Sequence, residues 1–216
     1  MQRTYPILPV LFLLFAGSTQ ADEVRVNFGG SPTIDGWNSF SGDQGPAVEL
    51  TDAHGEPTGI KLEMIDPFQS FENPNVAKGE LVGEAVAFEA ARQKTLFTAS
   101  AKGNPTGGFV LHLEPGQTYT LTFWASRTGN GKRWTKYIVE GAETSEQMLA
   151  AGGDASGPGN LSAVARFVGV VPDEEGKVTV TVTSPSEEDP YVNYDGFAYL
   201  TGMILEEQSA DEDDSE

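Results

Sequence analysis

The residues best suited to bind a ligand lie on either side of a short glycine-rich loop, residues 127–131. Segments 118–126 and 132–140 flank this loop, and each alternates apolar with polar residues. Alternation with period two is typical of β-strands, and a five-residue connection that contains glycine is typical of a hairpin. Pairing the two segments about the centre of the loop places Trp124 opposite Trp134. Because directly opposed side chains lie about 4.5–5.5 Å apart at Cβ, we expect the two indoles to touch.

The predicted hairpin has two faces that differ in character. One face carries Leu121, Phe123 and Tyr137 and should point into the core. The other carries the two tryptophans among Thr, Ser and Lys, where adjacent indoles would form a flat apolar platform with N–H donors at its edge. Such a platform suits the faces of pyranose rings, and Arg127 would add hydrogen bonds to sugar hydroxyls. Alternatively, the segment 79–93 or a neighbouring loop covers this face, and the tryptophans form a second small core.

Two other loops offer further candidates for ligand contact. Trp37 lies in the loop after the first predicted strand, and Tyr191 and Tyr194 lie in the loop before the last one. Acidic loop residues can also ligate a structural Ca²⁺, because hard cations take six to eight oxygen ligands. The sequence has no EF-hand spacing and selects no ligand set, and solvated carboxylates are the alternative. The acids concerned are Asp35, Asp43, Asp52, Asp189 and Asp195.

Familiar catalytic motifs are absent from the sequence. The chain has no cysteine, and its two histidines, His54 and His112, are far apart. This excludes a cysteine nucleophile and gives little basis for a histidine-dependent triad or a transition-metal site. The chain also lacks a Gly-x-Ser-x-Gly elbow, a His-Glu-x-x-His motif and a phosphate-binding glycine loop. Carboxylates are so abundant that a two-carboxylate hydrolase stays open as an alternative. We therefore expect a protein that is not an enzyme.

The elements that would position these residues are nearly all strands. One segment rich in Ala and Glu, 79–93, has the spacing of a short helix, and 148–153 fits either a short strand or a helical turn. Eight or nine antiparallel strands with one apolar face each must bury that face against a second sheet. We therefore predict an all-β fold, an antiparallel jelly-roll-like β-sandwich. Beyond the hairpin, further predicted strands with period-two alternation occupy residues 24–28, 60–64, 109–113, 164–171, 178–182 and 197–205.

The two ends of the chain differ from its middle. Residues 7–16 form an apolar run too short to span a bilayer, and small residues at Thr19 and Ala21 fit a cleavage site. This pattern predicts a signal peptide over residues 1–21, secretion to the periplasm or the exterior, and no membrane insertion after cleavage. The sandwich domain would occupy residues 22–205. Residues 206–216 carry seven acids and should form a disordered acidic tail.

The whole chain is strongly acidic. Its 216 residues include 32 Asp and Glu against 13 Lys and Arg, which gives a formal net charge of -19. Contacts with phosphate need clustered Lys and Arg, so this composition argues against nucleic acid as a partner. The same charge argues against binding to an anionic membrane surface.

Several segments, taken in order, resemble a known family. They are Val-Asn-Phe-Gly-Gly (26–30), Trp37-Asn38, the Asp-x-x-Gly turn at 52–55, Gly-Gln-Thr-Tyr-Thr-Leu-Thr-Phe-Trp-Ala-Ser-Arg-Thr-Gly (116–129), Thr-Lys-Tyr-Ile-Val-Glu-Gly (135–141) and Asp-Glu-Glu-Gly-Lys-Val-Thr-Val-Thr-Val (173–182). The chain resembles the galactose-binding-like β-sandwich domains of secreted bacterial proteins, which are similar to carbohydrate-binding modules. This resemblance implies a secreted, non-catalytic module that binds a polysaccharide or another glycan, or interacts with an extracellular matrix. A structural or adhesive surface protein without a glycan site is the alternative.

Overall fold

The computed structural model describes residues 23–30, 33–71, 76–128, 133–152, 157–189, 191 and 196–208. These residues form fourteen strands and two 3₁₀ helices, which confirms the predicted all-β class. The predicted signal peptide, residues 1–21, and most of the predicted tail, residues 209–216, lie outside the described residues. In the described part of the chain, no helix is long and apolar enough to cross a membrane.

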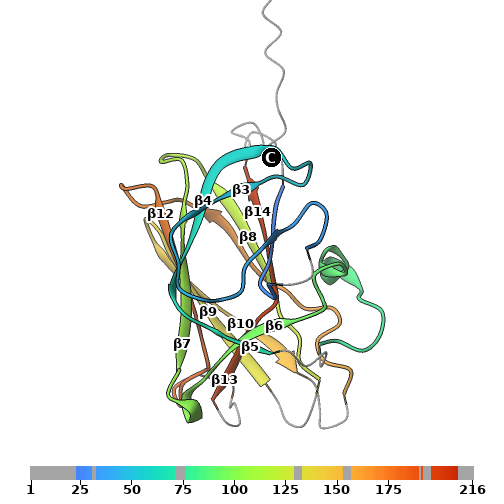
Figure 1. The fold of residues 1–216 in the computed structure, drawn as a ribbon. Coiled ribbons are helices and arrows are strands. Elements are labelled where there is room, and N and C mark those ends of the chain that lie inside the picture. The colour runs from blue at the N-terminus through green and yellow to red at the C-terminus, as the bar shows by residue number, and fades with distance from the viewer. Residues whose placement is uncertain are drawn as a thin grey trace, which may run out of the picture.

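Two large sheets face each other, and a smaller third sheet lies beside them (Figure 1). The five-stranded sheet has the order β11 (Ala165–Val170), β8 (Tyr119–Trp124), β14 (Gly202–Glu207), β1 (Val24–Asn27) and β2 (Asn38–Ser39). The six-stranded sheet has the order β10 (Thr144–Gly152), β9 (Arg133–Glu140), β12 (Lys177–Thr183), β7 (Thr106–His112), β4 (Pro57–Asp66) and β3 (Val48–Thr51). The three-stranded sheet has the order β13 (Phe197–Leu200), β6 (Thr95–Ala99) and β5 (Gln69–Phe71).

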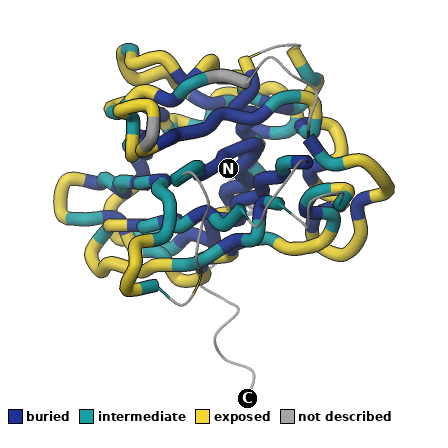
Figure 2. Tube along the Cα trace, turned by 90° about the horizontal axis from the view of Figure 1, so that it is seen from below, coloured by how far each residue is buried: buried dark blue, intermediate teal, exposed yellow. Residues whose placement is uncertain are grey.

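The main core lies between the two large sheets, and the buried segments occupy the interior of the molecule (Figure 2). Strand β12 shows how the sequence builds it, because Val178, Val180 and Val182 are buried while the threonines between them are half-buried. Across the core, the rings of Phe123 on β8 and Tyr137 on β9 stack with centroids 4.9 Å apart. The period-two prediction for these strands is therefore confirmed, and the architecture is the expected β-sandwich.

The segment 79–93 contains a shorter helix than the spacing predicted. Only Gly83–Phe88 is helical, and it is a 3₁₀ helix, η1. Gly79 and Gly83 both adopt positive φ, and the helix has no side-chain N-cap, so an α-helix has no favourable start here. Ala85 and Phe88 on η1 are nonetheless buried. A second 3₁₀ helix, η2, spans Ser100–Lys102.

Other boundaries also differ from the prediction. The run 197–205 is two strands, since Thr201 separates β13 from β14 and these belong to different sheets. The fourteen strands exceed the expected eight or nine because β2, β3, β5 and β6 lacked a clear alternation in sequence. The open alternative at 148–153 is resolved over its described residues, 148–152, which belong to strand β10. Finally, β14 continues past residue 205 through Glu207, and Gln208 donates a backbone hydrogen bond to Thr118, so the domain includes the first residues of the predicted tail.

Candidate functional site

The predicted hairpin between the two tryptophan strands does not exist. Strand β8 pairs with β11 and β14, whereas β9 pairs with β10 and β12, so both edges of each strand already have partners. The loop after β8 therefore crosses from one sheet to the other. Trp124 is in register with Gly202, and Trp134 is in register with Ala150. The two indoles thus lie on the outer faces of two different sheets, and the prediction that they touch is wrong.

Trp124 and Trp37 belong to a second small core on the outer face of the five-stranded sheet. Trp124 is fully buried and Trp37 is 7% exposed. The ring of Phe88, on η1, lies 6.0 Å from that of Trp124 and 6.2 Å from that of Trp37. The segment around η1 therefore covers this face, which was the alternative interpretation. Neither tryptophan is available to a ligand in this structure.

Trp134 has a different environment, on the outer face of the six-stranded sheet. It is half-buried, and its ring stacks on Tyr191 with centroids 3.8 Å apart and planes inclined by 16°. Tyr191 is 39% exposed. Trp134 lies on strand β9 and is half-buried, whereas Tyr191 lies on the segment after β12 and is more exposed. The tyrosine ring is therefore the outer ring of the stack. The structure thus brings together two of the predicted site residues, whereas Tyr194 and Asp195 lie outside the described residues.

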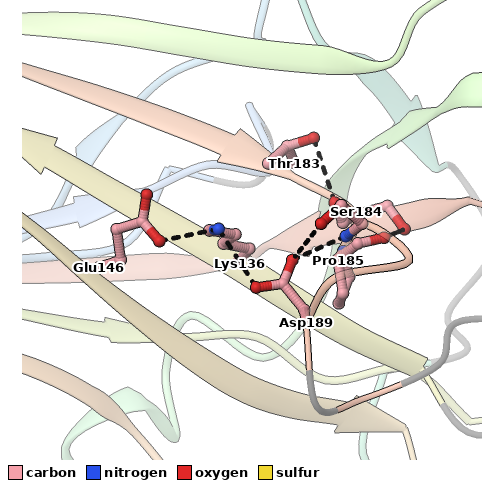
Figure 3. A network of polar contacts seen from close by, with 7 residues as sticks. Lys136, Glu146, Thr183, Ser184, Pro185 and Asp189 are labelled. Atoms are coloured by element: carbon pink, nitrogen blue, oxygen red, sulfur yellow. Dashed lines mark hydrogen bonds and ion pairs between the residues drawn. The ribbon is translucent and has the colours of Figure 1, made fainter.

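A polar network fixes the segment that carries Tyr191 (Figure 3). Lys136 Nζ contacts Glu146 Oε2 at 2.7 Å and Asp189 Oδ1 at 3.3 Å. The other oxygen of Asp189 accepts hydrogen bonds from the backbone N and the Oγ of Ser186, at 2.7 and 3.0 Å. Lys136 lies two residues after Trp134 on β9, and Asp189 lies two residues before Tyr191. An ion pair and a ring stack therefore fasten the same segment to the same face of the strand.

The charges in this network are set by its hydrogen bonds. The backbone N–H of Ser186 holds the pKa of Asp189 below its ordinary value, and Lys136 acts in the same direction. The hydrogen bond to Glu146 raises the pKa of Lys136, and Asp189 adds to this effect. Asp189 and Lys136 are therefore both charged at neutral pH. Sequence reasoning did not include Lys136, Glu146 or Ser186 among the site residues. Lys136 could have been found, because it lies two residues after Trp134 and therefore on the same face of the strand.

Arg127 does not join Trp134 and Tyr191. It follows β8, its backbone N–H donates to Ala151, and its side chain hydrogen-bonds Tyr199. Burial lowers the pKa of Arg127. Its side chain therefore contacts strand β13 of the three-stranded sheet rather than the ring stack.

Three of the acids considered as calcium ligands make local polar contacts of their own. Asp52 caps its turn by accepting hydrogen bonds from the backbone N–H groups of His54 and Glu56, and Asp43 accepts one from Ser41. Asp189 pairs with Lys136. Among the described residues, no group of three or more His, Cys, Asp or Glu side chains is placed to hold a metal ion.

Comparisons with known proteins find similar folds at low identity. No family model and no curated protein matches the chain. Among solved structures, the carbohydrate-binding module TmCBM61, solved in complex with β-1,4-galactotriose, is 13% identical, with 69% of this chain and 88% of that one covered and a TM-score of 0.34. The CBM36-1 domain of a multidomain xylanase from the hindgut metagenome of Trinervitermes trinervoides is 10% identical, with 68% and 95% covered and a TM-score of 0.35.

A third similar structure is the ANX1 ectodomain from Arabidopsis thaliana. It is 10% identical, with 88% of this chain and 55% of that one covered and a TM-score of 0.42. At these identities none of the likenesses assigns a ligand to this chain.

Proposed function

We propose that this chain is a secreted, non-catalytic carbohydrate-binding module whose sugar contact is the outer ring of the Trp134–Tyr191 stack. The observation that carries the proposal is an exposed tyrosine ring fixed from behind by an indole and from the side by an ion pair. The C–H faces of a pyranose ring are apolar, so they favour contact with an aromatic face. A ring already held in place loses little conformational freedom when the ligand binds.

Polar groups beside the stack suit the rest of a sugar. Thr181 and Thr183 of β12 lie in register with Ile138 and Lys136 of β9, so these side chains share the outer face that carries Trp134. The threonines are half-buried. Threonine hydroxyls both donate and accept hydrogen bonds, and lysine donates them, so together they can meet ring hydroxyls along the strand direction. An aromatic face with a few convergent polar groups is the usual composition of a sugar-sized site.

The test is a binding measurement on the exported protein with a panel of soluble polysaccharides, by affinity electrophoresis and calorimetry. Tyr191→Ala should weaken binding at least about tenfold, which corresponds to about 1.4 kcal/mol. Tyr191→Phe should retain most of the affinity, because it keeps the ring. Val171→Ala is the matched control, since Val171 is also 39% exposed but lies elsewhere on the surface.

Two outcomes would overturn the proposal. If the wild-type protein binds none of the neutral or acidic polysaccharides in the panel, the chain is better explained as a structural or adhesive protein. If a polysaccharide binds but Tyr191→Ala and Val171→Ala behave alike, the ring stack is not the site. Hydrolysis of a bound polysaccharide would contradict the non-catalytic part of the proposal.

A further inference from the structure

A group of cationic and aromatic side chains gathers at the end of the sandwich where β9 begins. Arg133, the first residue of β9, places its Cζ 4.9 Å from the ring centre of Phe197 and 5.7 Å from that of Tyr199. Lys102, at the end of η2, places its Nζ 5.3 Å from the Phe97 ring and 6.0 Å from the Phe197 ring. We call Arg133, Lys102 and Tyr199 the cationic cluster.

The local structure makes room for Arg133. Its register partner on β10 is Gly152, and a Cβ added to Gly152 would lie 3.0 Å from the Cβ of Arg133. A side chain at position 152 would therefore crowd the arginine. Two cations that contact one phenylalanine ring, with a glycine beside them, make a preformed arrangement rather than two independent surface charges.

These cations have a different environment from three arginines elsewhere in the chain. Arg25, Arg92 and Arg166 each pair with a glutamate at 2.8 to 3.0 Å. Arg133 and Lys102, by contrast, have no carboxylate within ion-pair distance among the described residues, and their contacts there are with aromatic rings and a phenol. The chain holds 32 acids against 13 bases, so two cations that have no acidic partner in the described part of the chain are candidates to meet an anion from outside.

The buried phenol of Tyr199 extends this arrangement. Tyr199 is fully buried, and its hydroxyl accepts a hydrogen bond from Arg133 Nη1. Arg127 approaches the same hydroxyl from the end of β8. Burial raises the pKa of Tyr199, while the two guanidinium groups oppose that rise. The phenol is therefore protonated at neutral pH. The Nε of Arg133 is buried without a hydrogen-bond partner among the described residues.

We propose that the cationic cluster binds an anionic substituent, a carboxylate or a sulfate ester, of an acidic polysaccharide. This inference rests on the proposed function, because the same chain of sugars would also contact the Trp134–Tyr191 stack. Arg133 and Trp134 are consecutive residues at the start of β9, so their side chains leave opposite faces of the strand, and one polymer touches both by passing around the end at which the strand begins. A guanidinium offers parallel N–H donors that match the two oxygens of a carboxylate or sulfate, and Lys102 adds a point charge.

The overall negative charge of the protein does not oppose this contact strongly. At physiological ionic strength the Debye length is about 8 Å, so distant carboxylates are screened from an anion at the cluster. Direct contacts with Arg133 and Lys102 are screened much less because they are short. The distant acids should act mainly by slowing the approach of a polyanion, and that effect should shrink as salt is added.

The experiment compares polymers that share a backbone but differ in charge. Polygalacturonate is compared with its fully methyl-esterified form, and dextran sulfate with dextran, by calorimetry at constant ionic strength. The acidic polymer of one pair should bind at least about tenfold more tightly than its neutral counterpart, and the pair that shows the preference identifies carboxylate or sulfate. In Arg133→Gln the ratio of acidic to neutral affinity should fall to near one. In Lys102→Gln the same ratio should fall by a factor of about three.

Controls separate this proposal from the function on which it rests. Lys61→Gln removes the same charge from an exposed position on β4, away from the cluster, and should leave the ratio unchanged. Lys102 is exposed, so its variant tests the proposal even if Arg133→Gln lowers stability. Equal affinity for acidic and neutral polymers overturns the anion site while leaving carbohydrate binding intact. Absence of binding to all four polymers counts against both proposals.

Discussion

Truncating Trp124 and Trp134 separately tests whether the first indole belongs to a buried core and the second to a surface site. Trp124→Ala removes a fully buried indole from the second core, where it stacks near Phe88. Truncating a buried Trp or Phe costs about 3–5 kcal/mol. The indole Nε1 of Trp124 is buried without a hydrogen-bond partner among the described residues, and losing that group returns part of the cost. We therefore expect about 3 kcal/mol, the lower end of the range.

Trp134→Ala should cost much less. The indole is half-buried, and it stacks on the ring of Tyr191. Aromatic pairs contribute about 0.5–1.5 kcal/mol beyond their buried area, and the tyrosine ring lost with the stack is already partly in water. We expect a loss of about 1 kcal/mol in the free energy of unfolding.

The assay is thermal and denaturant unfolding followed by circular dichroism, because each variant removes a fluorescent tryptophan. For a domain of this size, 1 kcal/mol shifts Tm by about 2–4 °C, so Trp124→Ala should lower Tm by roughly 6–12 °C and Trp134→Ala by no more than about 4 °C. Polysaccharide affinity should follow the opposite order, with the larger loss in Trp134→Ala. Similar losses of stability in both variants would refute the assignment of one indole to a core and the other to a surface site.

Two further predictions follow from close packing and from the ion pair. Gly202→Ala should destabilise the protein by about 1–3 kcal/mol in urea unfolding, because the new Cβ would lie 2.8 Å from Cδ1 of Phe88; Gly45→Ala, with no atom within 4 Å, is the control, and equal effects would contradict the close approach. The depressed pKa of Asp189 means that its pairing with Lys136 is fully present above the ordinary carboxyl pKa of about 3.9 and is lost as the pH falls through the lower folded value. The near-ultraviolet signal of the ring stack should thus stay constant from pH 7 to about pH 4 and decline only below that, whereas a decline centred near pH 6 would show that another group holds Tyr191.

The strands of the sandwich were predictable from sequence because each has a local signal. In β12 the alternation of Val178, Val180 and Val182 with threonines predicts that the valines face the core, and the structure agrees. Strand β8 was also found, but its burial on both faces was not. Thr120, Thr122 and Trp124 form an amphipathic outer face that fits either solvent or a covering segment. What covers them depends on η1, more than thirty residues earlier in the chain.

Strand pairing was less predictable because it is decided by non-local contacts. A short connection favours a hairpin, but the entropy of closing a longer loop grows only slowly with its length. Distant partners therefore prevail when they bury more apolar surface. Strand β8 takes β14, from the end of the chain, as a neighbour, and this lets Phe123 face Tyr137 across the core. Pairing β8 directly with β9 would put those two rings in one sheet, where they could not stack on each other across the core.

The candidate site illustrates the same division between local and non-local information. Trp134 and Tyr191 were both recognisable as candidates, yet their partnership depends on Lys136 and Asp189, and Asp189 had been considered only as a cation ligand. On a strand, residues two apart share a face, so Trp134 and Lys136 form a matched aromatic and cationic pair. The segment after β12 repeats that spacing with an acid and an aromatic in the complementary order. The match becomes readable only when the segment is known to lie along β9, because nothing in either sequence stretch alone specifies the other as its partner.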